Sequence, residues 1–363
     1  MTVTNFRIGL VGPLPPPFGG MANQTRQLEQ LLRDEGATVE LIQTNQAYRP
    51  QWVSQLKGLR AIFRLINYTN QLWQAANHVQ LFHVMANSGW SWHLFAAPVI
   101  WIGKLKGVPV IINYRGGEAG AFFDKAFFWV KPSLDRTTEI IVPSGFLEAV
   151  FNKRGYTTRI VPNIIDLSRF SPKETSAQPL QQKDVINILA ARNLEPIYDN
   201  ATVLRAFKII KEKIPAAHLT IAGSGVEEEY LKKLAKELTI DSSVTFTGRV
   251  DNKDMPALYQ SADIMVNGSL VDNMPISILE SLACGIPVVS TNAGGIPYLV
   301  EHNKTALLVS TKDHVAMADA LLTLIQDDVK RNEISNNGLK SIEKYTWVNV
   351  KNCLLPIYQE AIK

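Results

Sequence analysis

The chain is poor in cysteine and has no long apolar segment. Its 363 residues include two cysteines, Cys284 and Cys353, and neither belongs to a CxxC or Cys/His pattern. A disulfide framework and a zinc site are therefore not supported. No run approaches the roughly 20 apolar residues that span a bilayer, and the first residues lack the pattern of a signal peptide. We therefore expect a cytoplasmic protein.

Other patterns are also missing. The formal net charge of +4 is too small to indicate nucleic-acid binding. The glycine loop after the first expected strand is GG rather than GxGxxG, and no acid follows the second strand at the required place, which disfavours a nicotinamide-dependent dehydrogenase. No DxD metal motif is evident in the right place. Hydrophobic residues make up 46% of the chain, enough for two domains of roughly 100–200 residues.

Short β-branched runs alternate with amphipathic helical stretches, which is typical of parallel sheets with crossover helices. The pattern occurs twice and predicts an α/β chain with two Rossmann-like domains, separated by a linker within residues 162–184, which are rich in Pro, Ser and Gln. The expected strands are Phe6–Val11, Val39–Gln43, Val79–His83, Val108–Tyr114, Glu139–Val142 and Arg159–Val161, then Val185–Ala191, His218–Ala222, Val244–Thr247, Ile264–Asn267, Val288–Thr291 and Ala306–Val309.

The most informative stretch runs from Asn267 to Gly295 and reads NGSLVDNMPISILESLACGIPVVSTNAGG. It places Asp272 in a loop and Glu280 in a helix, and Pro275 suits the first helical turn. Free amides at a helix start, together with the helix dipole, favour phosphate. Two carboxylates on either side of that start can hold hydroxyl groups next to a bound diphosphate, which indicates a nucleotide-sugar.

These residues resemble the signature of the retaining glycosyltransferases with the GT-B fold, the glycosyltransferase family 4-like "glycosyl transferases group 1". The resemblance covers nearly the whole chain through GPLPPPFGGMANQ, IVPSGF, IVPNIIDLSRF, ARNLEPIYDN, LTIAGSGVEEEYL, VTFTGRV and the acidic motif. It implies two Rossmann-like domains facing across a cleft. Residues 1–165 form the acceptor-side domain, 166–184 the linker and 185–340 the donor domain, and 341–363 form a helix that crosses back to the first domain.

The same resemblance implies a set of site residues. Arg192 would hold the donor diphosphate, Asp272 a sugar hydroxyl and Glu280 the ribose, while a guanidinium also suits a negatively charged leaving group. Arg192, Asp272 and Arg115 are the expected catalytic residues. The expected donor-binding residues are Gly19, Gly20, Arg192, Tyr198, Gly223, Gly225, Arg249, Val250, Asn273, Met274, Pro275, Ile276, Ser277 and Glu280.

The sequence departs from the family pattern at three positions. Asp272 stands where glutamate is usual, Tyr198 where a lysine is common, and Arg115 where many members have a histidine. Arginine stays protonated near neutral pH and cannot act as a base, so Arg115 would instead meet the donor phosphate or an anionic acceptor. His83 is the nearest other histidine, and a histidine on an apolar strand is more often a core residue.

The resemblance implies transfer of a hexose from UDP- or GDP-hexose to a saccharide or lipid-linked saccharide, with retained configuration and without a required metal or cofactor. Cell-envelope polysaccharide or glycolipid synthesis is the expected setting. Two alternatives stay open: a nucleotide-sugar 2-epimerase of the same architecture, and a degenerate member that binds nucleotide without turnover.

Two segments are rich in aromatic residues. Residues 48–77 read as a basic amphipathic helix, which is compatible either with packing on its own domain or with peripheral contact to an anionic membrane, on the inner face of the membrane. Residues 121–131, AFFDKAFFWVK, carry five aromatic side chains. We expect core packing for this second run.

Overall fold

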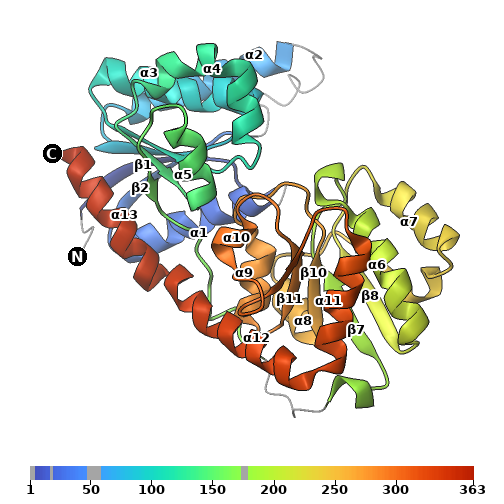
Figure 1. The fold of residues 1–363 in the computed structure, drawn as a ribbon. Coiled ribbons are helices and arrows are strands. Elements are labelled where there is room, and N and C mark those ends of the chain that lie inside the picture. Colours follow the sequence, from blue (N-terminus) through green and yellow to red (C-terminus); the bar gives the residue numbers. More distant parts are fainter. Residues whose placement is uncertain (1–4, 17–18, 47–58, 173–178) are drawn as a thin grey trace. The chain divides into compact units, whose positions relative to one another are not determined.

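The computed structural model describes residues 5–16, 19–46, 59–172 and 179–363 (Figure 1). The chain divides into two compact units. Unit 1 comprises Met1–Ile164 and Trp347–Lys363, and unit 2 comprises Ile165–Thr346. The last helix thus belongs to the unit formed by the first half of the chain.

Unit 1 contains a six-stranded parallel sheet in the order β2-β1-β3-β4-β5-β6. Its strands are β1 (Arg7–Gly12), β2 (Thr38–Gln43), β3 (Leu81–Ala86), β4 (Val110–Tyr114), β5 (Glu139–Val142) and β6 (Arg159–Ile160). Its helices are α1 (Gly20–Asp34), α2 (Leu59–Ala75), the π-helical turn η2 (Trp92–Ala96), α3 (Ala97–Lys106), α4 (Ala119–Leu134), α5 (Gly145–Asn152) and α13 (Trp347–Ile362). All side chains of β3 and β4 are buried, as expected for central strands of a sheet covered on both faces.

Unit 2 repeats the architecture with the strand order β12-β11-β10-β7-β8-β9. Its strands are β7 (Ile186–Ala190), β8 (Ala217–Ala222), β9 (Val244–Gly248), β10 (Ile264–Asn267), β11 (Val288–Thr291) and β12 (Leu307–Val309). Its helices are α6 (Asn200–Lys213), α7 (Glu228–Glu237), α8 (Met255–Ser261), α9 (Ile276–Ala283), α10 (Ile296–Leu299), α11 (His314–Gln326) and α12 (Asp328–Ser341), with short 3₁₀ turns η3 (Leu180–Gln182), η4 (Pro196–Tyr198), η5 (Asp241–Ser243) and η6 (Ile342–Tyr345).

Both sheets have a topological switch point. In unit 2 the chain winds outward in one direction from β7 and in the other from β10, and in unit 1 the corresponding pair is β1 and β3. Ligands of open parallel sheets bind at the carboxyl ends of the strands at such a point. The two Rossmann-like folds and their expected strands are confirmed, and the strand boundaries shift by two residues or fewer, except that β3 begins at Leu81 and extends to Ala86.

Two local expectations are corrected. Pro275 is the extended residue just before α9 rather than part of its first turn, because the helix begins at Ile276. In α4, Phe123 is buried, but Phe128 and Trp129 are 78% and 73% exposed, so only part of the aromatic run packs into the core. Of the basic segment 48–77, residues 48–58 lie outside the described residues, and α2 covers most of the remainder.

Candidate functional site

The switch point of unit 2 brings together residues from two loops. Arg192 follows β7, and Asp272 follows β10, which pairs with β7. Helix α9 begins directly after the second loop. Because neighbouring parallel strands end at the same edge of the sheet, the side chains after β7 and β10 can meet there.

Arg192 is the centre of this group. Its Nη2 donates to the Asp272 carboxylate in an ion pair, and its Nη1 lies 3.4 Å from Ser277 Oγ in the first turn of α9. The guanidinium also lies over the Tyr198 ring, with 4.0 Å between Cζ and the ring centroid. The two ion-pair side chains are 13% and 14% exposed, so water screens this contact less than it would at the open surface.

Backbone contacts explain several glycines near Arg192. A Cβ on Gly223 would lie 2.1 Å from the Arg192 carbonyl oxygen, and one on Gly225 would lie 2.2 Å from that of Leu194. The Gly223 amide donates to the Gly248 carbonyl at 3.0 Å. The turn after β8 is thus packed directly against the segment that carries Arg192.

Arg249 and Val250 follow β9 beside this turn. Val250 is partly buried against the core of unit 2. Asn273, Met274 and Ser277 are buried, whereas Ile276 is half-buried. The residues expected at the donor from unit 2 therefore lie on consecutive loops at one edge of one sheet.

A second pair of glycines, Gly294 and Gly295, supports the loop of Asp272. The sequence alone assigned this pair no role. A Cβ on Gly294 would lie 2.1 Å from the Asp272 carbonyl oxygen, and one on Gly295 would lie 1.9 Å from that of Asn273. The Gly295 amide donates to the Asp272 carbonyl at 2.8 Å. The NAGG sequence could have indicated such a close backbone approach.

Glu280 lies inside α9, half-buried. Burial raises the pKa of this carboxyl to about 7, although Tyr259 and the cations of Arg169 and Arg192 favour the carboxylate. Arg169 and Tyr259 were not among the expected site residues. Arg169 belongs to the IVPNIIDLSRF motif, which was the only signal for it in the sequence.

In unit 1, Arg115 follows β4 and donates from Nε to Asn113 Oδ1 at 3.1 Å and from Nη1 to Asn163 Oδ1. Asn113 Nδ2 then lies 3.1 Å from His83 Nε2, and His83 Nδ1 lies 2.7 Å from the Tyr358 hydroxyl on α13. Arginine only donates, so it fixes the Asn113 oxygen toward itself and leaves the Asn113 amide to donate to His83 Nε2. His83 therefore carries its proton on Nδ1.

This chain of hydrogen bonds explains His83. The side chain is fully buried, and burial together with the Arg115 charge lowers its pKa to about 3. Burial also lowers the pKa of Arg115 to about 10, so that it remains a cation near neutral pH. His83 is a satisfied core residue.

Gly19 precedes α1 and Gly20 is its first residue. No heavy atom of the described residues would lie within 4 Å of a Cβ on Gly19. A cavity of about 130 Å³ lies at the carboxyl ends of β1, β2 and β3, beside the start of α1. Its lining is Pro13, Met21, Thr44, Asn45, Arg64, Val84, Met85, Ala86, Ser91, Phe95 and Ala96.

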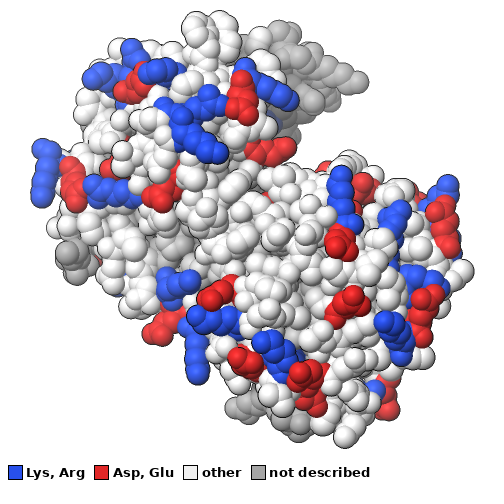
Figure 2. All heavy atoms as spheres, viewed as in Figure 1, with Lys and Arg blue, Asp and Glu red and all other residues white. Residues whose placement is uncertain are grey.

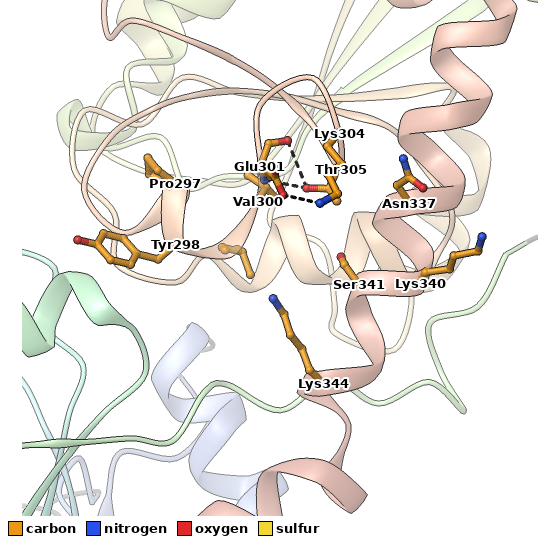
Figure 3. A pocket seen from close by; sticks show the side chains of 11 residues that line it. Pro297, Tyr298, Val300, Glu301, Lys304, Thr305, Asn337, Lys340, Ser341 and Lys344 are labelled. Atoms are coloured by element: carbon orange, nitrogen blue, oxygen red, sulfur yellow. Dashed lines mark hydrogen bonds and ion pairs between the residues drawn. The ribbon is translucent and has the colours of Figure 1, made fainter.

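Another hollow, of about 530 Å³, lies in unit 2 between α10, the turn at residues 300–305 and α12 (Figure 3). Lys304, Lys340 and Lys344 line it, and Lys304 pairs with Glu301 at 2.9 Å. None of Arg192, Asp272 and Glu280 lines this hollow.

Within the described part of the chain, no three His, Cys, Asp or Glu side chains are grouped so that they could hold a metal ion. The described helices likewise include none that is long and apolar enough to cross a membrane.

Part of the chain matches a known family. Residues 172–341 match the model of the family described as glycosyl transferases group 1. A GDP-mannose-dependent alpha-(1-6)-phosphatidylinositol monomannoside mannosyltransferase of Mycobacterium tuberculosis is 32% identical over 178 residues, 46% of this chain and 46% of that protein. The chain thus spans about half the length of this curated relative.

Solved structures with the same fold align with nearly the whole chain. Sucrose-phosphate synthase from Thermosynechococcus elongatus aligns with 98% of this chain and 99% of its own, with a TM-score of 0.78 and 18% identity. HepE of Anabaena in complex with UDP aligns with 98% of this chain and 100% of its own, with a TM-score of 0.75 and 17% identity. At these identities the likeness shows the fold alone.

Proposed function

Because residues 172–341 belong to the glycosyl transferases group 1 family, we propose that the chain transfers a hexose from a nucleotide-sugar to an acceptor hydroxyl, with retained anomeric configuration and without a metal ion. One observation carries the proposal: Arg192, at the switch point of unit 2, contacts Asp272, Ser277 and Tyr198 at once. These three side chains come from the connections after β7 and β10 and from the start of α9, which border such a ligand site.

The Arg192–Asp272 pair has a consequence for donor binding. Without donor, the two charges neutralise each other. A donor diphosphate offers oxygens that suit the guanidinium fork, so it competes with Asp272 for Arg192. The Asp272 carboxylate is then available to accept a hydrogen bond from a sugar hydroxyl. Donor binding would thus replace the one Arg192–Asp272 contact with two charge-assisted contacts, one from Arg192 to phosphate and one from the hydroxyl to Asp272.

Arg192 would also stabilise the leaving diphosphate. Because Tyr198 stands where a lysine is common in the family, stabilisation of the leaving group would rest more heavily on Arg192. The ring of Tyr198 holds the Arg192 guanidinium by a cation–π contact. Free amides at the start of α9 add partial positive charge. The departing phosphate oxygen would take the acceptor proton on the same face of the sugar, so the proposal assigns no base to the protein.

Glu280 is assigned to the donor ribose, where its carboxylate would accept hydrogen bonds from two hydroxyls. Its pKa of about 7 makes this contact depend on pH, since the protonated acid accepts less well. The affinity for a nucleotide-sugar should therefore rise about tenfold from about pH 6 to about pH 8, as the ionised fraction of Glu280 increases. Titration calorimetry at several pH values measures this slope.

Glu280→Gln provides the control for the pH dependence. The amide does not titrate, so its donor affinity should be lower than that of the ionised wild type and independent of pH over the same range. A wild-type protein whose donor affinity stays flat would contradict the assignment, as would a glutamine variant that keeps the slope.

The relatives suggest the donor and acceptor classes. The mycobacterial relative uses GDP-mannose and a phosphatidylinositol mannoside by its name, and the HepE structure contains UDP. We assign a UDP- or GDP-hexose to unit 2 and a saccharide or lipid-linked saccharide to unit 1, in polysaccharide or glycolipid synthesis. The cavity beside α1, with Arg115 on the same sheet edge, is the assigned acceptor side.

Product analysis tests the reaction. Purified protein is incubated with 1-¹³C-labelled UDP- and GDP-hexoses, with and without extracted saccharide and lipid-linked acceptors, and the anomeric carbon is followed by NMR. The proposal predicts a new glycoside with the donor's configuration only when acceptor is present. Conversion of the hexose at C2 without acceptor would instead identify a 2-epimerase, and donor binding without any product would identify a degenerate member.

A further inference from the structure

The outer layer of unit 1 carries an unusual concentration of exposed aromatic side chains. Among the described residues, every exposed phenylalanine or tryptophan lies in the stretch from Phe63 to Trp129. We define the aromatic surface by four of these aromatic side chains and one exposed leucine, all on α2, α3 and α4. These are Trp73 on α2 (47% exposed), Trp101 and Leu105 on α3 (41% and 73%), and Phe128 and Trp129 on α4 (78% and 73%).

Printed contacts show that these side chains belong to one surface. Helix α3 packs between α2 and α4. Lys106 of α3 lies 4.0 Å above the Trp73 ring of α2. Arg136, just after α4, lies 4.3 Å above the Trp101 ring of α3. The two cation–π contacts join the three helices across their solvent-facing side, which Figure 1 shows as the outer helical layer of this unit.

The charges on this surface are mainly positive. Helices α2 and α3 contain no Asp or Glu. The two acids near the exposed part of α4 are already paired, Asp124 with Arg154 and Asp135 with Lys131. Exposed basic side chains therefore flank the aromatic ones, and Figure 2 shows Lys and Arg side chains, with some Asp and Glu among them, over the helices of this unit.

We propose that the aromatic surface docks on an anionic lipid bilayer. Tryptophan, with an apolar ring and one N–H, favours the membrane–water interface. Lysine and arginine next to it add attraction to anionic headgroups, about 1 kcal/mol or about fivefold for each cation near the surface. A protein partner for this surface would need acidic side chains opposite the basic ones, whereas an anionic bilayer supplies an apolar interior and negatively charged headgroups together. The inference concerns unit 1 alone and does not rest on the proposed reaction.

Vesicle sedimentation tests the proposal. The full chain is mixed with vesicles of phosphatidylcholine alone, or with about one third phosphatidylserine, at low and high salt. We expect sedimentation with the anionic vesicles only, weaker at high salt, with a blue shift of tryptophan emission. Replacing Phe128→Ser together with Trp129→Ser should lower the partition coefficient at least about tenfold. Replacing two exposed lysines, Lys104→Gln on α3 with Lys125→Gln on α4, should lower it about twenty-fivefold.

A matched control removes exposed apolar side chains elsewhere. Val315→Ser with Val329→Ser alters residues of unit 2 that are 51% and 80% exposed, and it should bind vesicles like the unaltered protein. Thermal unfolding confirms that each variant is folded. Unaltered protein that stays in the supernatant with anionic vesicles would overturn the proposal. A Phe128/Trp129 variant that binds anionic vesicles normally would also overturn it. The same holds if the wild type is a dimer and this variant is a monomer, because the surface would then bind a second copy of the chain.

Discussion

Replacing Arg192 with alanine should reduce kcat/KM for the donor by about 10³-fold, since a single preorganised charge facing a leaving group contributes on that scale. Arg192, on the loop after β7, contacts Asp272 on the loop after β10 and Ser277 at the start of α9. The loss should appear in donor affinity and in kcat. Steady-state kinetics with saturating acceptor, together with donor titration, separate the two effects.

The Asp272 side chain is only 14% exposed, and the same substitution removes its ion-pair partner. The free energy of unfolding should therefore fall by about 1–3 kcal/mol. Adding Asp272→Asn should recover much of that stability without restoring transfer. Arg205→Ala is the matched control, because Arg205 on α6 makes one side-chain hydrogen bond to the described residues, to the Ala201 carbonyl at 3.5 Å. An Arg192→Ala enzyme with normal kcat/KM would remove Arg192 from the mechanism.

Gly295→Ala should disable the site without touching any proposed ligand-binding side chain. The new methyl group would lie 1.9 Å from the Asn273 carbonyl oxygen, so the loop of Asp272 and Asn273 has to move. A displacement of about 1 Å in a positioning loop costs about 10²-fold in rate, and overpacking of this kind lowers the free energy of unfolding by about 1–3 kcal/mol.

Gly120→Ala is the control for this substitution, because no heavy atom of the described residues lies within 4 Å of a Cβ at that position of α4. In a helix, alanine should leave stability unchanged or raise it by about 0.5–1 kcal/mol. Chemical denaturation and donor titration compare both variants with the wild type. If Gly295→Ala binds donor normally, the close backbone approach does not position Asp272.

The sequence predicted the scaffold well because the relevant signals are local. Buried parallel strands require continuous β-branched and apolar runs, so strands such as Val288–Thr291 are visible in the sequence. The position of Arg192 after β7 and Asp272 after β10 followed from the same pattern. Their direct ion pair did not, because side-chain contacts depend on how two distant loops meet.

Other features of the site depend on surroundings that a linear pattern does not specify. The pKa of Glu280 is raised by burial and partly lowered again by Tyr259 and Arg169, which lie far from it in sequence. The need for glycine at Gly294 and Gly295 depends on the backbone of Asp272 and Asn273. The exposure of Trp129 could not be predicted either, because an aromatic residue can face the core or the solvent on the same helix.

The central claim is that unit 2 binds a nucleotide-sugar through Arg192 and Glu280. Thermal unfolding of the purified chain with UDP-, GDP- and ADP-hexoses tests it most directly, with Arg192→Ala and Glu280→Ala alongside. Donor at about a hundred times its dissociation constant should raise the free energy of unfolding by about 2.7 kcal/mol. We predict such a shift with one nucleotide series in the wild type and its loss in both variants. No shift with any donor, or an equal shift in the variants, would contradict the account.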